Sequence, residues 1–192
     1  MKEMSRHIIN CSALPTNFPT HLHQSEFWES LGRAVGTFGF LEEVLSKAIF
    51  SFTATKPYSE NEIEMAYEKW LPKLECSLKD TLWSLTESYG KAVRENPDAT
   101  IENLEDLISQ LKEVSKIRNV ICHGSWRAPN SDGASIPLFV NNQMEIFLTP
   151  IDAAFLNQLQ AHTKELICSI INTVTHMGWR FPGSNSPGKA IW

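Results

Sequence analysis

Apolar residues recur three or four positions apart over four long stretches of the chain, the spacing that places them along one face of an α-helix. The first stretch runs from Ser25, a residue type that caps helices, to about Phe52. Within it, Gly32 and Gly36 lie one turn apart, and each costs about 1 kcal/mol of helix propensity relative to alanine. We expect either close approach of another backbone at these glycines or a locally weak helix.

The second stretch begins at the capping box Ser59-Glu60-Asn61-Glu62 and continues to about Val93. Pro72 lies inside it and has no amide hydrogen to donate to the preceding turn. We therefore expect a kink or a short break near Trp70 to Lys73.

The third stretch carries an apolar stripe from Ile101 to Ile121, with Thr100 as its predicted cap and Glu102 and Glu105 near its positive end. Gly124 is a residue type that commonly ends a helix. The sequence thus predicts a third helix that ends at Gly124.

Two short runs, 135–140 and 143–148, follow a turn-rich segment and are separated by Asn141-Asn142, a pair that tolerates positive φ. They predict a small β-hairpin. Pro150 suits the first turn of a last helix, which we expect to end near Gly178.

These elements predict an all-α fold, a four-to-five-helix up-and-down bundle with the small β-hairpin inserted before the last helix. We expect an irregular N-terminal segment over residues 1–24, a helical bundle domain over 25–178 and a flexible C-terminal tail over 179–192. Trp179, Phe181 and Trp192 are the tail residues with the chemistry to dock on the bundle.

Composition and charge narrow the possible partners. The formal net charge is −5 and the pI is near 5.7, so no general basic field attracts nucleic acid or an anionic membrane, and any nucleic-acid contact must be local.

The four cysteines show no paired spacing and no signal-peptide pattern precedes them, which predicts a reduced, cytoplasmic protein. No run approaches the roughly 18 apolar residues of a membrane span, so no membrane role is expected.

The candidate chemistry lies in the stretch Lys116 to Trp126, near the end of the third helix. Arg118 and His123 differ in direction by about 140° on a regular helix, whereas Asn119 and His123 share a face. A guanidinium can hold two phosphate oxygens and an imidazole can transfer protons near neutral pH, so the pair suits phosphoryl chemistry without a metal. Alternatively, Arg118 extends to solvent or pairs with Glu42 or Glu43, and His123 is a helix C-terminal residue favoured by the helix dipole.

The string Arg118-Asn119-Val120-Ile121-Cys122-His123-Gly124 resembles the motif of the HEPN superfamily: arginine, a polar residue, three more residues and histidine on a helix of an α-helical bundle. The Leu41-Glu42 pair on an early helix and the inserted hairpin extend the resemblance over about residues 25–178. It implies a metal-independent endoribonuclease that acts as a homodimer, often as a toxin or an antiviral effector.

The resemblance also implies roles for single residues. Arg118 would bind the scissile phosphate, His123 would transfer protons, and Asn119 would orient the pair, with no cofactor. A two-fold axis beside the third helix would bring two copies of this motif into one cleft. Lys116 and Arg127 would add positive charge for the RNA substrate. Trp126 would either stack on an unpaired base or, as we favour, anchor the hairpin.

Two rival functions remain open from the sequence. One is a non-catalytic helical module that dimerises, binds a nucleotide or holds a partner through the same surface. The other is a regulatory or antitoxin-like partner of a second protein, and a cognate antitoxin is also a possible partner of the toxin itself. No metal site is expected, because the Cys11, His21 and His23 set lacks a fourth ligand. Asn172 and His176 are interpreted as a polar surface pair, with a pocket as the alternative.

Overall fold

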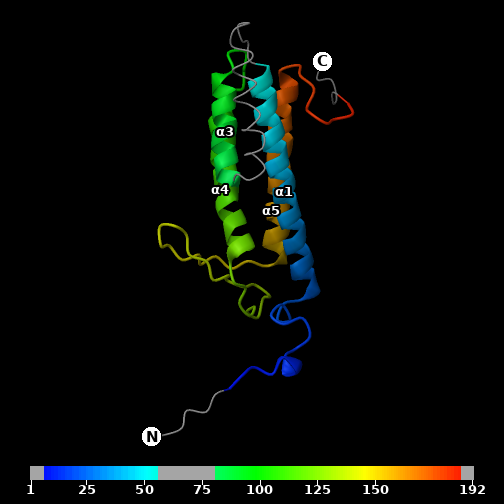
Figure 1. The fold of residues 1–192 in the computed structure, drawn as a ribbon, viewed down its shortest axis with the longest axis vertical. Coiled ribbons are helices and arrows are strands. Elements are labelled where there is room, and N and C mark those ends of the chain that lie inside the picture. The colour runs from blue at the N-terminus through cyan, green and yellow to red at the C-terminus, as the bar shows by residue number, and fades with distance from the viewer. Residues whose placement is uncertain (1–6, 56–80, 187–192) are drawn as a thin grey trace.

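The computed structural model describes residues 7–55 and 81–186. In these two ranges the chain forms one short 3₁₀ helix and four α-helices: η1 (Cys11–Ala13), α1 (Ser25–Ala54), α3 (Leu82–Glu95), α4 (Leu104–His123) and α5 (Ala153–His176). The four long helices lie side by side in a bundle, so the predicted all-α bundle is confirmed (Figure 1). The predicted capping box at Ser59 and the predicted break near Pro72 lie outside the described residues.

Helix α1 contributes the longest buried face of the bundle. Its apolar side chains at the three-and-four spacing are almost fully buried, among them Phe38, Leu41, Leu45 and Phe52, and they pack on α3, α4 and α5. Ser25 is the first residue of α1 and Gln24 precedes it without a side-chain cap, so the predicted cap at Ser25 is wrong. No side-chain cap stabilises the start of α1, whereas Phe27 and Leu31 in its first turns are buried.

The face of α1 that carries Gly32 and Gly36 is open. No atom of the described chain lies within 4 Å of the position that a Cβ would take at either glycine. Close backbone approach, one of the two alternatives, is therefore not found within residues 7–55 and 81–186. The glycines weaken α1 locally without a packing gain inside the described chain.

Helix α4 begins later than the sequence predicts. Its first residue is Leu104, its N-cap is Asn103, and the Asn103 side chain makes no capping bond. The Thr100 hydroxyl lies 3.8 Å from Met177 Sδ, at the far end of α5, instead of capping the helix. The predicted cap at Thr100 is wrong because a tertiary contact takes its hydroxyl.

Helix α5 also begins after its predicted start. The Asp152 carboxylate accepts a 2.7 Å hydrogen bond from the Phe155 amide, which makes Asp152 the cap and Ala153 the first helical residue. Ile151 is still extended and pairs with Ser135. Pro150 therefore lies outside the helix, and its predicted place in the first turn is wrong.

The segment between α4 and α5 forms a turn at Asn141, the position predicted for the turn of the hairpin. Asn141 closes the turn, because its side-chain oxygen accepts hydrogen bonds from the amides of Gln143 and Glu145, each 2.9 Å long. Pairing consists of the isolated antiparallel bridges Ser125–Leu138, Ser135–Ile151 and Val140–Ile146. The described chain forms no regular strand there, so the segment is a turn with single bridges. We call residues 135–148 the hairpin segment.

The start of the predicted tail packs on the bundle. The Trp179 ring lies edge-on to Phe52, with ring centroids 5.5 Å apart, and Phe181 is buried. The predicted flexible tail thus begins with two residues that dock, which was the alternative for its aromatic residues, while Trp192 lies outside the described residues. Among the helices that the structure describes, none has the length and apolar character needed to cross a bilayer.

Candidate functional site

The candidate site lies at the C-terminal end of α4, where Gly124 ends the helix. The Gly124 amide donates to the Val120 carbonyl at 2.8 Å, and its backbone is extended rather than left-handed. A Cβ at Gly124 would lie 2.5 Å from the Val120 oxygen and 2.8 Å from Pro137 Cβ. Glycine is therefore needed here because the hairpin segment approaches the helix end closely, and this approach fixes the surroundings of His123.

Arg118 links α4 to α1. Its Nη2 atom lies 3.2 Å from Glu42 Oε1, and its Nη1 donates a long, 3.4 Å hydrogen bond to Asn119 Oδ1. The Arg118 side chain is 24% exposed and that of Glu42 is 26% exposed, so the pair lies at the edge of the bundle. Glu42 Oε1 is buried and accepts no hydrogen bond in the described chain, so the contact is an ion pair of poor hydrogen-bond geometry. The alternative that Arg118 pairs with Glu42 is confirmed.

Cys122 lies beside this ion pair, one helical turn after Arg118. Burial raises the pKa of its thiol, the Arg118 charge lowers that pKa, and the Glu42 charge raises it again. A raised pKa leaves less thiolate at neutral pH, so the environment does not activate Cys122 as a nucleophile. Cys122, Arg118 and Glu42 therefore lie close together on one side of α4.

His123, the last residue of α4, lies on a different side of the helix from Arg118. Its side chain is exposed, and no hydrogen bond or ion pair joins it to Arg118 within the described ranges. Asn119 precedes it by one turn and shares its face. One chain alone thus keeps the two candidate catalytic groups on separate sides, as the angle of about 140° implies.

The three candidate RNA-binding residues differ in their surroundings. Lys116 is exposed and pairs with Glu113 at 2.6 Å, and Arg127 is exposed. Trp126 instead packs edge-on against Phe27, with ring centroids 5.0 Å apart. This contact holds the ring against α1, as the anchoring interpretation expects.

His23 completes an aromatic cluster around Trp126 that sequence reasoning missed. Its ring stacks on Phe27 at 4.2 Å between centroids and meets Trp126 edge-on at 6.3 Å. His23 Nε2 is buried and has no hydrogen-bond partner in the part of the chain that is described, and burial lowers the pKa of the imidazole. The cluster ties the irregular N-terminal segment to the base of the hairpin segment. The nearest signal in the sequence was the local group of aromatic rings at His23, Phe27 and Trp28.

A small pocket opens on the Asn119 side of α4. It has a volume of about 310 Å³ and lies between α4 and the hairpin segment. Its lining residues are Glu113, Lys116, Ile117, Asn119, Val120, Phe139, Asn141, Glu145, Ile146 and Phe147. The structure thus gathers Asn119 and Lys116 around one hollow, whereas Arg118 faces α1.

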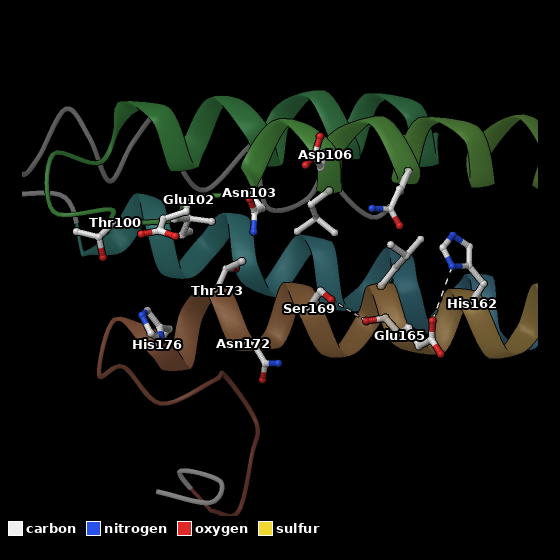
Figure 2. A pocket seen from close by; sticks show the side chains of 14 residues that line it. Thr100, Glu102, Asn103, Asp106, His162, Glu165, Ser169, Asn172, Thr173 and His176 are labelled. Atoms are coloured by element: carbon white, nitrogen blue, oxygen red, sulfur yellow. Dashed lines mark hydrogen bonds and ion pairs between the residues drawn. The ribbon is translucent and has the colours of Figure 1, made fainter. Parts of the chain in front are cut away.

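A larger groove lies between the first half of α4 and the facing side of α5, as Figure 2 shows. It has a volume of about 850 Å³, and Asn172 and His176 line it while both are exposed, so they form a polar surface pair that borders a groove. Its lining includes Glu102, Asp106 and Glu165 but no lysine or arginine. Phosphate groups are repelled from such a lining, so this groove is not a candidate RNA site. No group of three metal-ligating side chains suited to an ion occurs in the described ranges.

The chain was compared with protein-family models, with curated proteins and with solved structures. None of the three comparisons found a match.

Proposed function

We propose that this chain is a HEPN-type, metal-independent endoribonuclease that acts as a homodimer, in a toxin or antiviral defence role. One observation carries the proposal. A half-buried arginine, oriented by Glu42 and Asn119, lies within about 8 Å along the helix axis of an exposed histidine at the helix end. These are the groups that cleavage of RNA by its own 2′-hydroxyl requires.

Arg118 is suited to the phosphate because its position is restrained but its donors are not exhausted. A guanidinium has five N–H donors. The contacts with Glu42 and Asn119 involve Nη2 and Nη1 and leave further donors for the oxygens of an incoming phosphate. The negative charge of Glu42 orients the guanidinium in the free protein, and a phosphate would compete for the same positive charge.

His123 supplies the proton transfer, and a second copy of the chain supplies its partner. In the reaction the ribose 2′-oxygen bonds to phosphorus and loses its proton to one imidazole, while the bond to the 5′-oxygen breaks and that oxygen takes a proton from the other imidazole. Arg118 stabilises the extra negative charge on the phosphate oxygens. The exposure of His123 supports this arrangement, because two α4 ends can meet across a two-fold axis only if both are accessible.

The charges near this helix end also support a local RNA contact in an acidic protein. Lys116 and Arg127 are both exposed and lie within the last turns of α4 or just after it. The acidic groove lies along the first half of α4, beginning around Asn103 and ending at Gln110. Phosphate is therefore directed to the Arg118 end of the helix and away from the groove.

A non-catalytic binding module is the second candidate, and the ion pair itself favours it. The contact between Arg118 and Glu42 joins α4 to α1, which a purely structural arginine would also do. In that case the surface around Asn119 and His123 holds a partner or a nucleotide without cleaving RNA.

The test is cleavage of purified RNA in the presence of a chelator. We expect His123→Ala and Arg118→Ala each to reduce the cleavage rate by about 10²-fold or more, because each removes a group that acts in the transition state. His176→Ala is the matched control, since His176 is likewise an exposed histidine at a helix C-terminus and should leave the rate unchanged. Circular dichroism and sedimentation confirm that fold and oligomeric state are unaltered. Absence of cleavage by the wild type over several RNAs and pH values would favour the binding module.

A further inference from the structure

The pocket between α4 and the hairpin segment has a size and lining suited to one flat ring. Its volume of about 310 Å³ is near the lower limit for small-molecule sites. Ile117 and Val120 line it from α4, and Phe139, Ile146 and Phe147 line it from the hairpin segment. Phe139 and Phe147 also pack on the core, so this apolar wall is held in place.

Asn119 is the carboxamide of the pocket with the most unused hydrogen-bonding capacity. Its Nδ2 donates to no residue of the described chain, and its Oδ1 receives only the 3.4 Å contact from Arg118. Asn141 is mostly used by its own turn, since its Oδ1 accepts two amides and its Nδ2 donates to Glu145 at 2.8 Å. A free carboxamide offers a donor and an acceptor side by side, which is the pattern that pairs with N7 and the N6 amino group of adenine.

The charges around the pocket favour a base over a phosphate. Glu113 and Glu145 both line it, and carboxylates accept hydrogen bonds from an exocyclic amino group but repel a phosphate. Lys116, the cation in the lining, already pairs with Glu113 at 2.6 Å. A nucleotide would therefore enter with its base in the pocket and its phosphate outside.

We infer that this pocket binds one unpaired adenine base of an RNA, with Phe139 and Phe147 as the apolar wall and Asn119 reading the base edge. The inference rests on the proposed function, because Asn119 also contacts Arg118, the residue proposed to bind the scissile phosphate. RNA cleavage then occurs next to an adenine. The aromatic side chains that contact the base are Phe139 and Phe147 of the hairpin segment, and Trp126 takes no part.

Binding is tested without cleavage, by titrating the intact protein with adenosine, guanosine, cytidine and uridine and following the backbone amide signals of Asn119 and Phe139 by NMR. We expect adenosine to shift both signals, and uridine, which lacks an exocyclic amino group, to shift them at least 10-fold less at equal concentration. Equal shifts with all four nucleosides, or no shift with any of them, would overturn the inference.

Two variants connect the signal to the pocket. Asn119→Leu should remove the preference for adenosine over uridine while Phe139 still shifts, and Phe147→Ala should weaken adenosine binding about 10-fold. Leu148→Ala is the control, because Leu148 lies on the same segment, is 72% exposed and is not part of the lining. If Leu148→Ala weakens binding as much as Phe147→Ala, the pocket is not the binding site.

The two proposals can fail separately. Adenosine binding by a protein that cleaves no RNA would uphold the pocket and overturn the nuclease. Chelator-resistant cleavage at equal rates beside all four bases, with no adenosine signal, would uphold the nuclease and overturn the pocket.

Discussion

Arg118 lies between Glu42 on α1 and Asn119 on its own helix, so its guanidinium links two helices and, on the proposed function, would also bind a phosphate. With about a quarter of each side chain exposed, the ion pair is neither a surface contact nor a buried one. Its contribution to stability should be modest, because solvent still screens part of the attraction. The two roles can therefore be separated by changing Glu42 and leaving Arg118 in place.

Glu42→Gln should strengthen RNA binding at low salt and lower the free energy of unfolding by about 1 kcal/mol. The stronger binding follows because Arg118 loses the carboxylate that competes with phosphate. RNA affinity is measured by fluorescence anisotropy with a 2′-deoxy-substituted oligonucleotide, and stability by urea unfolding.

Glu43→Gln is the control for this prediction. Glu43 is the next residue of α1 and pairs with Lys47 at 2.6 Å, away from Arg118. It should leave RNA affinity unchanged. If Glu42→Gln changes RNA affinity no more than Glu43→Gln does, Arg118 does not contact the phosphate.

His23 should make the free energy of unfolding depend on pH. Burial lowers the pKa of its imidazole in the folded protein, so the unfolded chain binds a proton at a higher pH than the folded chain does. The stability that neutral His23 provides is present above its unfolded pKa of about 6.5 and decreases as the pH falls through that value toward the folded pKa. Urea unfolding between pH 7.5 and 5.5 should show this decrease.

His23→Phe should flatten the stability curve over this pH range, because phenylalanine keeps the stacking on Phe27 and does not titrate. His21→Phe serves as the control, since His21 is exposed, and should keep the slope of the native protein. Equal slopes for the native protein and His23→Phe would show that His23 does not cause the dependence.

At the scale of helices and turns, hydrophobic periodicity predicted the stretches that α1, α4 and α5 occupy, because their apolar stripes meet in one core. The exact starts were not predictable. Thr100 has the chemistry of a cap but contacts Met177, and Asp152 caps α5 beyond Pro150. Caps compete with tertiary contacts that a single sequence does not reveal.

In the candidate site, too, some contacts were predictable from the sequence and others were not. Pairing of Arg118 with Glu42 was among the predicted alternatives, because both residues lie on helices with strong periodicity. The contact of Trp126 with His23 was not, since the N-terminal segment has no period and approaches from about a hundred residues away. The pocket beside Asn119 was missed because its second wall comes from irregular chain, at Phe139 and Phe147.

Gly124→Ala should lower the free energy of unfolding by about 1–3 kcal/mol, since the new methyl group would overlap the Val120 carbonyl and Pro137. Gly36→Ala is the matched change on the open face of α1 and should raise stability by about 1 kcal/mol, because it only improves helix propensity. Thermal or urea unfolding of both variants checks the pair. A loss of stability in Gly36→Ala would mean that another chain packs closely on that face.

At the scale of the whole molecule, the acidic groove and the candidate site lie toward opposite ends of α4. The first half of α4 borders a groove lined by Glu102, Asp106 and Glu165 (Figure 2), and its last turns carry Arg118 and the exposed His123. Since α4 rises about 1.5 Å per residue, Asp106 and His123 lie roughly 25 Å apart along its axis. On the proposed mechanism, two copies joined at the His123 end would bring both histidines together and keep the acidic grooves apart. The proposed mechanism therefore predicts a dimer in solution.

The most direct test is the chemistry of the ends that cleavage leaves. A short RNA containing adenines is incubated with the wild type in the presence of a chelator. The control is the same RNA with one 2′-deoxynucleotide at the cleaved position, and the masses of the products are measured by mass spectrometry. The proposed mechanism predicts a 2′,3′-cyclic phosphate on the 5′ fragment, no cleavage of the substituted RNA, and product formation reduced about 10²-fold or more with Arg118→Ala or His123→Ala. Cleavage of the substituted RNA, or a 5′-phosphate on the 3′ fragment, would contradict it.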